Sequence, residues 1–126
     1  MLLRRLLLFG FVLFSASAVL AASVNVTGTW RTELPGRQGN PRPYVFHLKQ
    51  APDGTLTGTV KGFRSEGPIR DGSVRGDKIR FSAENQYQAR MVLMTFSGVV
   101  KGNRMELKVE FADGGGSLHI VATREE

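Results

Sequence analysis

Apolar and polar residues alternate along most of the chain after residue 23, and this alternation predicts its strands. Between Val24 and Leu34 the apolar residues fall on even positions, among them Trp30, the only tryptophan. A period of two is typical of a β-strand with one buried face. The period returns in further runs separated by turn residues. We therefore predict strands near residues 26–34, 43–50, 55–62, 69–75, 78–84, 87–99, 104–112 and 117–124.

The strands predict an all-β fold, because no stretch after the first 22 residues has the 3.6-residue period of a helix. A short internal repeat supports this prediction. Val74–Phe81 matches Val100–Leu107, and both run from a strand end through a Gly-Asp or Gly-Asn turn into an alternating strand. Eight sequential strands with short turns favour a single eight-stranded antiparallel up-and-down β-barrel, which has no exposed edge strand. A two-sheet β-sandwich of the same strands is the alternative.

Three segments are predicted to interrupt the strands. The stretch Pro35–Pro43 contains three prolines and two glycines, which exclude a helix or a central strand, so it is predicted to be a loop. Gly62–Pro68 is predicted to be a second loop. Ile69–Arg75 is predicted to form two short strand pieces around an Asp71-Gly72 turn.

The segment Met91–Phe96 breaks the alternation, because both of its faces are apolar. A strand buried on both sides, a bulge that switches faces, or a contact between subunits would each explain it. Self-association through this segment would use Met91, Val92, Leu93, Met94 and Phe96.

The first 22 residues are predicted to be a signal peptide, followed by a barrel domain over residues 23–126. Arg4 and Arg5 precede the apolar run Leu6–Leu20, and small residues follow it. The protein is therefore expected to be periplasmic or secreted, with membrane contact only through this segment before cleavage. An uncleaved anchor is the alternative, because the seventeen residues Leu6–Ala22 carry no charge. The chain has no cysteine, which excludes disulfides and a lipid-modified N-terminus.

Charge gives no sign of a nucleic-acid partner. Without the two leader arginines, 15 basic and 11 acidic residues remain, a net charge of +4. These charges are scattered along the strands and often alternate with apolar residues, which is typical of a solvated face.

The two ends of the barrel domain resemble those of lipocalins and their calycin relatives, such as avidins. Gly28-Thr29-Trp30 opens the first strand, and Arg124 shares the parity of the apolar residues in the last strand. The resemblance implies that Trp30 closes one end of a β-barrel and that Arg124 lies across its ring, with Gly28 beside them. Guanidinium over indole is a favourable cation–π pair. The GTW start, the LTGTV strand and the hairpin pattern also resemble small secreted bacterial proteins of unknown function.

Catalysis is not expected. The only histidines, His47 and His119, fall on the polar face of their strands, and so do Glu106 and Glu110. The second and last strands are not neighbours in a closed barrel, so the two histidines do not form a metal site. We predict that the protein is not an enzyme and has neither a metal nor another cofactor.

The interior of an eight-stranded barrel is just wide enough for its own side chains or for one small ligand. The residues predicted to point inward are Trp30, Thr32, Leu34, Tyr44, Phe46, Leu48, Leu56, Val60, Ile69, Val74, Ile79, Phe81, Met105, Leu107, Val109, Phe111, Leu118, Ile120 and Ala122. Gly58 and Gly62 share their face and are expected to leave room. The candidate ligand-binding residues are Thr32, Tyr44, Phe46, Gly58 and Phe63.

Three functions follow as hypotheses. The first is a secreted barrel that binds a small apolar ligand, and the second is a protein-interaction or oligomer-forming module with a filled core. A hydrolytic enzyme is the third and has the least support. An internal cavity favours the first hypothesis, whereas a filled barrel with an apolar outer patch favours the second.

Overall fold

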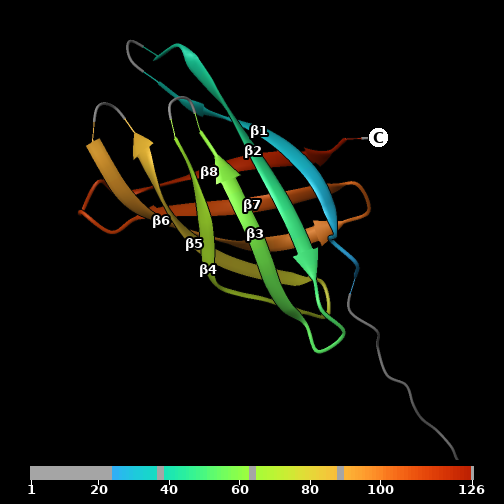
Figure 1. The fold of residues 1–126 in the computed structure, drawn as a ribbon. Helices are drawn as coiled ribbons and strands as arrows, with labels where there is room; N and C mark the ends of the chain where they lie inside the picture. The colour runs from blue at the N-terminus through green and yellow to red at the C-terminus, as the bar shows by residue number, and fades with distance from the viewer. Residues whose placement is uncertain (1–23, 37–38, 63–64, 88–89, 126) are drawn as a thin grey trace, which may run out of the picture.

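A computed structural model describes residues 24–36, 39–62, 65–87 and 90–125, and in residue 87 it describes the backbone alone. These residues form a closed barrel in which each strand is antiparallel to the next in sequence, from β1 to β8 (Figure 1). The strands are β1 (Gly28–Pro35), β2 (Pro41–Gln50), β3 (Thr55–Lys61), β4 (Glu66–Arg75), β5 (Lys78–Tyr87), β6 (Arg90–Lys101), β7 (Arg104–Phe111) and β8 (Ser117–Arg124). The predicted up-and-down barrel is confirmed, and the sandwich is excluded.

The prediction of a turn at Asp71-Gly72 is wrong, because β4 continues through these residues. The pairing of β4 with β5 shifts register between Arg70 and Ser73, and Asp71 has a φ of 54°. Aspartate tolerates the left-handed conformation, and an extra residue in one strand makes a β-bulge that bends it. The Asp71-Gly72 pair, which has the sequence of a hairpin turn, therefore forms a bulge that bends β4.

The predicted loops at Pro35–Pro43 and Gly62–Pro68 are too long. Pro35 pairs with Pro41 at the end of the β1–β2 ladder, and Glu66 already pairs with Lys61 of β3. The β2–β3 ladder begins only at Val45, so the earlier part of β2 is an edge. Proline is tolerated there because no ladder needs its missing N–H.

The two copies of the internal repeat form neighbouring hairpins, as predicted. β4 and β5 are joined by Gly76-Asp77, and β6 and β7 by Gly102-Asn103. Gly76 and Gly102 have φ values of 60° and 63°, which suits a two-residue turn with glycine at its first central position.

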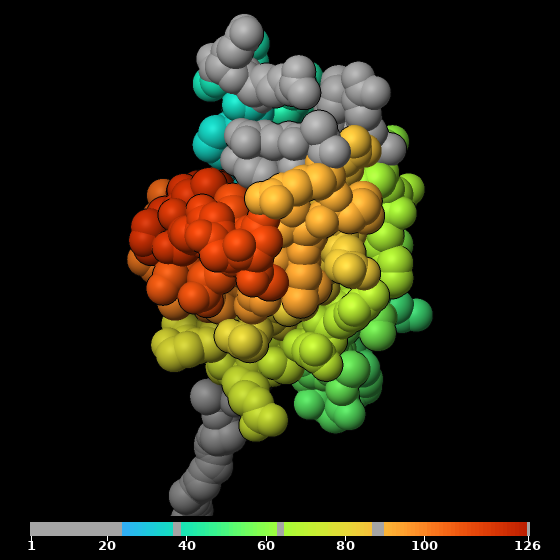
Figure 2. Space-filling view, turned by 90° about the vertical axis from the view of Figure 1, so that its left-hand side faces the viewer, coloured from blue at the N-terminus to red at the C-terminus, as the bar shows by residue number. Residues whose placement is uncertain are grey.

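The barrel has two ends, which we call the hairpin end and the loop end. The hairpin end comprises the turn between β2 and β3, the two repeated hairpins, and the chain at Val24, all on the right of Figure 1. Val24 N donates to Gly76 O at 3.0 Å, and Arg124 N donates to Asn103 O at 2.9 Å. The loop end lies opposite and faces the viewer in Figure 2, where the β7–β8 turn stands beside β5 and β6. Arg90 and Asp113 form an ion pair across it.

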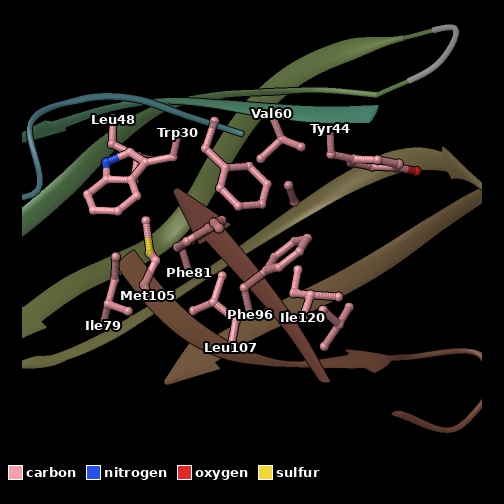
Figure 3. Packing of buried hydrophobic residues seen from close by; sticks show 14 of the residues in the cluster. Trp30, Tyr44, Leu48, Val60, Ile79, Phe81, Phe96, Met105, Leu107 and Ile120 are labelled. Carbon is pink, nitrogen blue, oxygen red and sulfur yellow. The ribbon is translucent and has the colours of Figure 1, made fainter. Parts of the chain in front are cut away.

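Side chains fill the middle of the barrel. Phe46, Phe81 and Phe96 form an aromatic cluster with ring centroids 4.9–5.3 Å apart, and Trp30 and Met105 pack beside it (Figure 3). The residues predicted to point inward are buried, except that Ile69, Phe111 and Leu118 are half-buried. Residues buried beyond that prediction are Val26, Ala83, Asn85, Val92, Met94, Phe96 and Val100.

Candidate functional site

Trp30 and Arg124 close the hairpin end of the barrel. The indole is fully buried, and its Nε1 donates to Val26 O at 2.9 Å. The Arg124 guanidinium carbon lies 4.4 Å from the centroid of the ring. The predicted contact is therefore present, and Gly28 lies beside it, since a Cβ on Gly28 would be 3.5 Å from Arg124 Nη1.

Each nitrogen of the Arg124 guanidinium also donates a hydrogen bond. It donates from Nη1 to Thr27 O at 2.8 Å, from Nη2 to Asn25 O at 2.9 Å, and from Nε to Asn103 Oδ1 at 3.0 Å. These partners lie before β1 and in the β6–β7 hairpin, so one side chain joins three parts of the hairpin end. The role of this group is structural.

Three of the candidate ligand-binding residues are engaged in contacts within the barrel. Phe46 belongs to the aromatic cluster, and buried Tyr44 donates from its hydroxyl to Gln86 O at 3.0 Å. The prediction that Gly58 leaves room is wrong, because a Cβ there would lie 1.8 Å from His47 O. Its absent side chain allows two strands to approach each other. Phe63 lies outside the described residues.

The space beside Gly62 is occupied by Asn85, a buried polar residue that the sequence analysis missed. Asn85 is 0% exposed, and its Nδ2 donates to Val60 O at 3.0 Å. Its Oδ1 accepts from Ser65 Oγ at 2.9 Å and from Gln86 N at 2.9 Å. Asn85 shares the inward parity of Phe81 and Ala83 in β5, and this parity could have identified it as buried. Both the oxygen and the nitrogen of the Asn85 amide are hydrogen-bonded within the protein. Asn85 therefore stabilises the loop end and leaves no polar group for a ligand.

The seam between β1 and β8 is the least complete ladder of the barrel. Its register comprises only Trp30↔Arg124 and Arg31↔Thr123. Each strand continues on its other side, where β1 pairs with β2 as far as Pro35 and β8 pairs with β7 back to Ser117. Residues 32–35 and 117–122 are thus strand edges that face each other without a ladder.

Backbone groups of β8 point into this gap. Arg124 N donates toward β7, whereas Glu125 N donates to Thr29 O at 2.8 Å, toward β1. In an antiparallel strand this direction alternates, so the N–H and C=O of His119 and Val121 also face β1. A continued ladder would place Glu33 opposite Val121. Instead, the Thr32 hydroxyl donates to Val121 O at 2.8 Å.

The gap forms a hollow of about 570 Å³, which we call the seam cleft. Its apolar lining includes Leu118, which is half-buried, and Ile120, which is 8% exposed, although both belong to the inward-facing set. Val121 at its rim is 49% exposed. The cleft is lined by Arg31, Thr32, Glu33, Pro35, Pro43, Leu118, His119, Ile120, Val121 and Thr123.

A second hollow, of about 490 Å³, lies on the other side of β8 and reaches over β7 to β6. It shares His119, Ile120 and Val121 with the seam cleft. The first half of β8 therefore stands between two depressions of the outer surface.

His47 and His119 are exposed on the outer face, as predicted, and so are Glu106 and Glu110. Within the described ranges, no three histidine or carboxylate side chains lie close enough to hold a metal ion. Among the residues that the structure describes, the one clear pKa shift is that of Asp53 in the β2–β3 turn. Hydrogen bonds from the Thr55 backbone N–H and hydroxyl lower the pKa of this exposed carboxyl, which stabilises the turn.

The apolar segment of β6 alternates like the other strands. Val92, Met94 and Phe96 point inward and are buried, whereas Met91 is 61% exposed and Leu93 is half-buried. The strand is not buried on both sides at Met91, and its registers with β5 and β7 run without a bulge, so these two explanations are wrong. Self-association through this face stays a prediction.

In the part of the chain that the structure describes, no helix is long and apolar enough to cross a membrane. Comparison with protein-family models, with curated proteins and with solved structures found no match.

Proposed function

We propose that this barrel is a non-catalytic interaction module that binds an extended peptide segment of a partner protein in the seam cleft. The observation that carries the proposal is the β1–β8 ladder, which stops after two residue pairs although both strands continue. Two facing strand edges with free backbone groups are a template for strand addition.

The lining of the cleft indicates what kind of segment would fit. The edge of β1 from residue 32 to residue 35 spans roughly 13 Å, which accommodates about four extended residues. Alternate side chains of an added strand point to opposite faces. Apolar side chains on one face would cover Leu118 and Ile120, and the other face would lie beside Arg31, Glu33 and His119 at the rim.

A small apolar ligand in the same cleft is the second candidate function. A volume of about 570 Å³ is within the range of ligand pockets, and the hydroxyl of Thr32 lies among apolar residues there. The peptide is favoured because the hollow lies between strand edges at the surface, whereas side chains pack the middle of the barrel.

We also propose that the module acts outside the cytoplasm and belongs among the calycins. The basic and apolar sequence of residues 1–22 supports export, and the Gly28, Trp30 and Arg124 arrangement supports the kinship. N-terminal sequencing of the exported protein is expected to give a start near Ala22 or Ser23. A start at Met1 would contradict cleavage.

A disulfide lock tests the seam directly, because the chain has no cysteine of its own. Glu33→Cys with Val121→Cys would join the two edges, and His47→Cys with Thr59→Cys would join the paired strands β2 and β3 as a matched control. Linear peptides selected from a phage library on the wild-type protein serve as probes. We expect oxidation to abolish their binding only in the seam variant, and reduction to restore it.

Val121→Pro provides a second test that requires no cross-link. It removes an N–H that faces the cleft and leaves the β7–β8 ladder intact, so it is expected to weaken peptide binding without unfolding the barrel. Undiminished binding by both locked and proline variants would overturn the proposal. The second candidate would be favoured by two results together. The library would yield no peptide, and the protein would take up the apolar dye N-phenyl-1-naphthylamine unless the disulfide lock is closed.

A further inference from the structure

The two repeated hairpins carry a cluster of cations at the hairpin end. Arg75 pairs with Lys78 across the first turn, and Lys101 pairs with Arg104 across the second. Arg80 lies two residues further along β5. The hairpins lie side by side, because Val100 N donates to Asp77 O at 2.8 Å. All five basic side chains are exposed, so the internal repeat places its charges on one surface.

Acidic residues neutralise only part of this cluster. Asp77 lies 3.7 Å from Lys78, and Glu106 forms ion pairs with Lys101 at 3.5 Å and with Arg104 at 2.8 Å. Arg75 and Arg80 form no ion pair with any residue that the structure describes. Elsewhere on this end, Glu125 forms an ion pair with Arg31. The five cations and two carboxylates of the hairpin cluster therefore leave an excess of three positive charges.

The chain enters the barrel at the same end. Val24 N is hydrogen-bonded to Gly76 O, at the tip of the first hairpin. The uncharged run Leu6–Ala22 precedes it in the sequence, separated by Ser23 alone. One residue spans at most about 3.6 Å. In the sequence, the apolar run of the predicted leader is therefore followed at once by the hairpin end.

We propose that the hairpin end is a membrane-facing surface that binds the anionic headgroups of a phospholipid bilayer. Basic residues near an anionic leaflet are attracted to it within the Debye length. The flanking cations are exposed side chains at the tips of the hairpins, so they have access to a flat surface. The proposal goes beyond the sequence prediction, which limited membrane contact to the leader, and it is independent of the seam cleft.

Residues 23–126 are suited to the test, because all eight strands and the Trp30–Arg124 closure lie within them. Sedimentation with vesicles measures their partitioning at about 0.1 M salt. One set of vesicles contains equal parts of phosphatidylcholine and phosphatidylglycerol, and the other contains phosphatidylcholine alone. We expect binding to the anionic vesicles only, and weaker binding as salt is raised.

Two double variants distinguish the effect of the hairpin cations on vesicle binding from the effect of net charge. Arg75→Gln with Arg104→Gln removes two hairpin cations, and Lys61→Gln with Arg70→Gln removes two cations from the other part of the barrel. Each removed cation near a membrane is worth about five-fold in partitioning, so the first variant is expected to bind about twenty-five-fold more weakly. The control is expected to lose less than two-fold. If the first variant does not fold, Arg80→Gln replaces it in the test and is expected to give a smaller loss of binding.

Three outcomes would overturn the proposal. One is equal binding to neutral and anionic vesicles. Another is an equal loss in the two double variants, which would mean that net charge alone governs binding. The third is binding to heparin without binding to vesicles, which would assign the cluster to soluble polyanions.

Discussion

At the scale of single residues, Arg124 decides how the barrel is closed. It shares the inward parity of β8, where a charged group is costly unless it is paired. The indole of Trp30 covers one face of the guanidinium, and carbonyl groups of Asn25 and Thr27 accept its hydrogens. The sequence predicted this contact through the resemblance to calycins, and the inward parity of Arg124 supported it.

Removal of the indole tests its burial. Trp30→Ala is expected to lower the free energy of unfolding by about 3–5 kcal/mol, the usual cost of deleting a buried large aromatic side chain. Chemical denaturation measures this loss. Val121→Ala, at an exposed position, is the control and is expected to change stability by no more than about 0.5 kcal/mol. A loss below about 1 kcal/mol for Trp30→Ala would mean that the ring contributes little to the core.

The coupling between the two residues is a separate prediction. Arg124→Lys keeps the charge but loses the planar group that stacks on the ring and its forked hydrogen bonds. A double-mutant cycle with Trp30→Phe is expected to give a coupling energy of about 0.5–2 kcal/mol. Zero coupling would show that the 4.4 Å contact contributes nothing to closure.

At the scale of strands, alternation predicted the elements well, and local turn chemistry was the less reliable guide. Asp71-Gly72 has the composition of a turn, but its neighbours on β3 and β5 hold β4 as one strand with a bulge. Pro41 was assigned to a loop, but it pairs with Pro35 where β2 has a partner on one side only. Both errors have one cause, since strand pairing depends on distant residues that a local pattern does not contain.

Lysine substitutions on β6 test the alternation of its apolar segment. Val92→Lys places a charge in the core and is expected to destabilise the barrel by several kcal/mol or prevent folding. Leu93→Lys lies on the outer face and is expected to cost about 1 kcal/mol or less in a monomer. Thermal unfolding compares the two. Equal and large losses in both variants would show that a second subunit or another segment covers the outer face.

At the scale of the whole molecule, the barrel is tightly closed at the hairpin end and incompletely paired along the seam. Four of the five candidate ligand-binding residues were drawn from inward parity, which does not distinguish a packed interior from an empty one. Phe46 and Gly58 belong to that packing, whereas Thr32 lies in the seam cleft. The cleft was not predictable, because it depends on where the ladder between the first and last strands stops.

The most direct test of this account is amide hydrogen exchange along β8, measured residue by residue by NMR. Thr123 and Glu125, which face β1 inside the paired part of the seam, are expected to exchange slowly. His119 and Val121 face β1 beyond it and are expected to exchange much faster. Ile120 and Ala122, which face β7, serve as the internal control and are expected to stay protected. Equal protection of His119, Val121 and Thr123 would mean that the ladder continues, and it would remove the edge to which a peptide is proposed to bind.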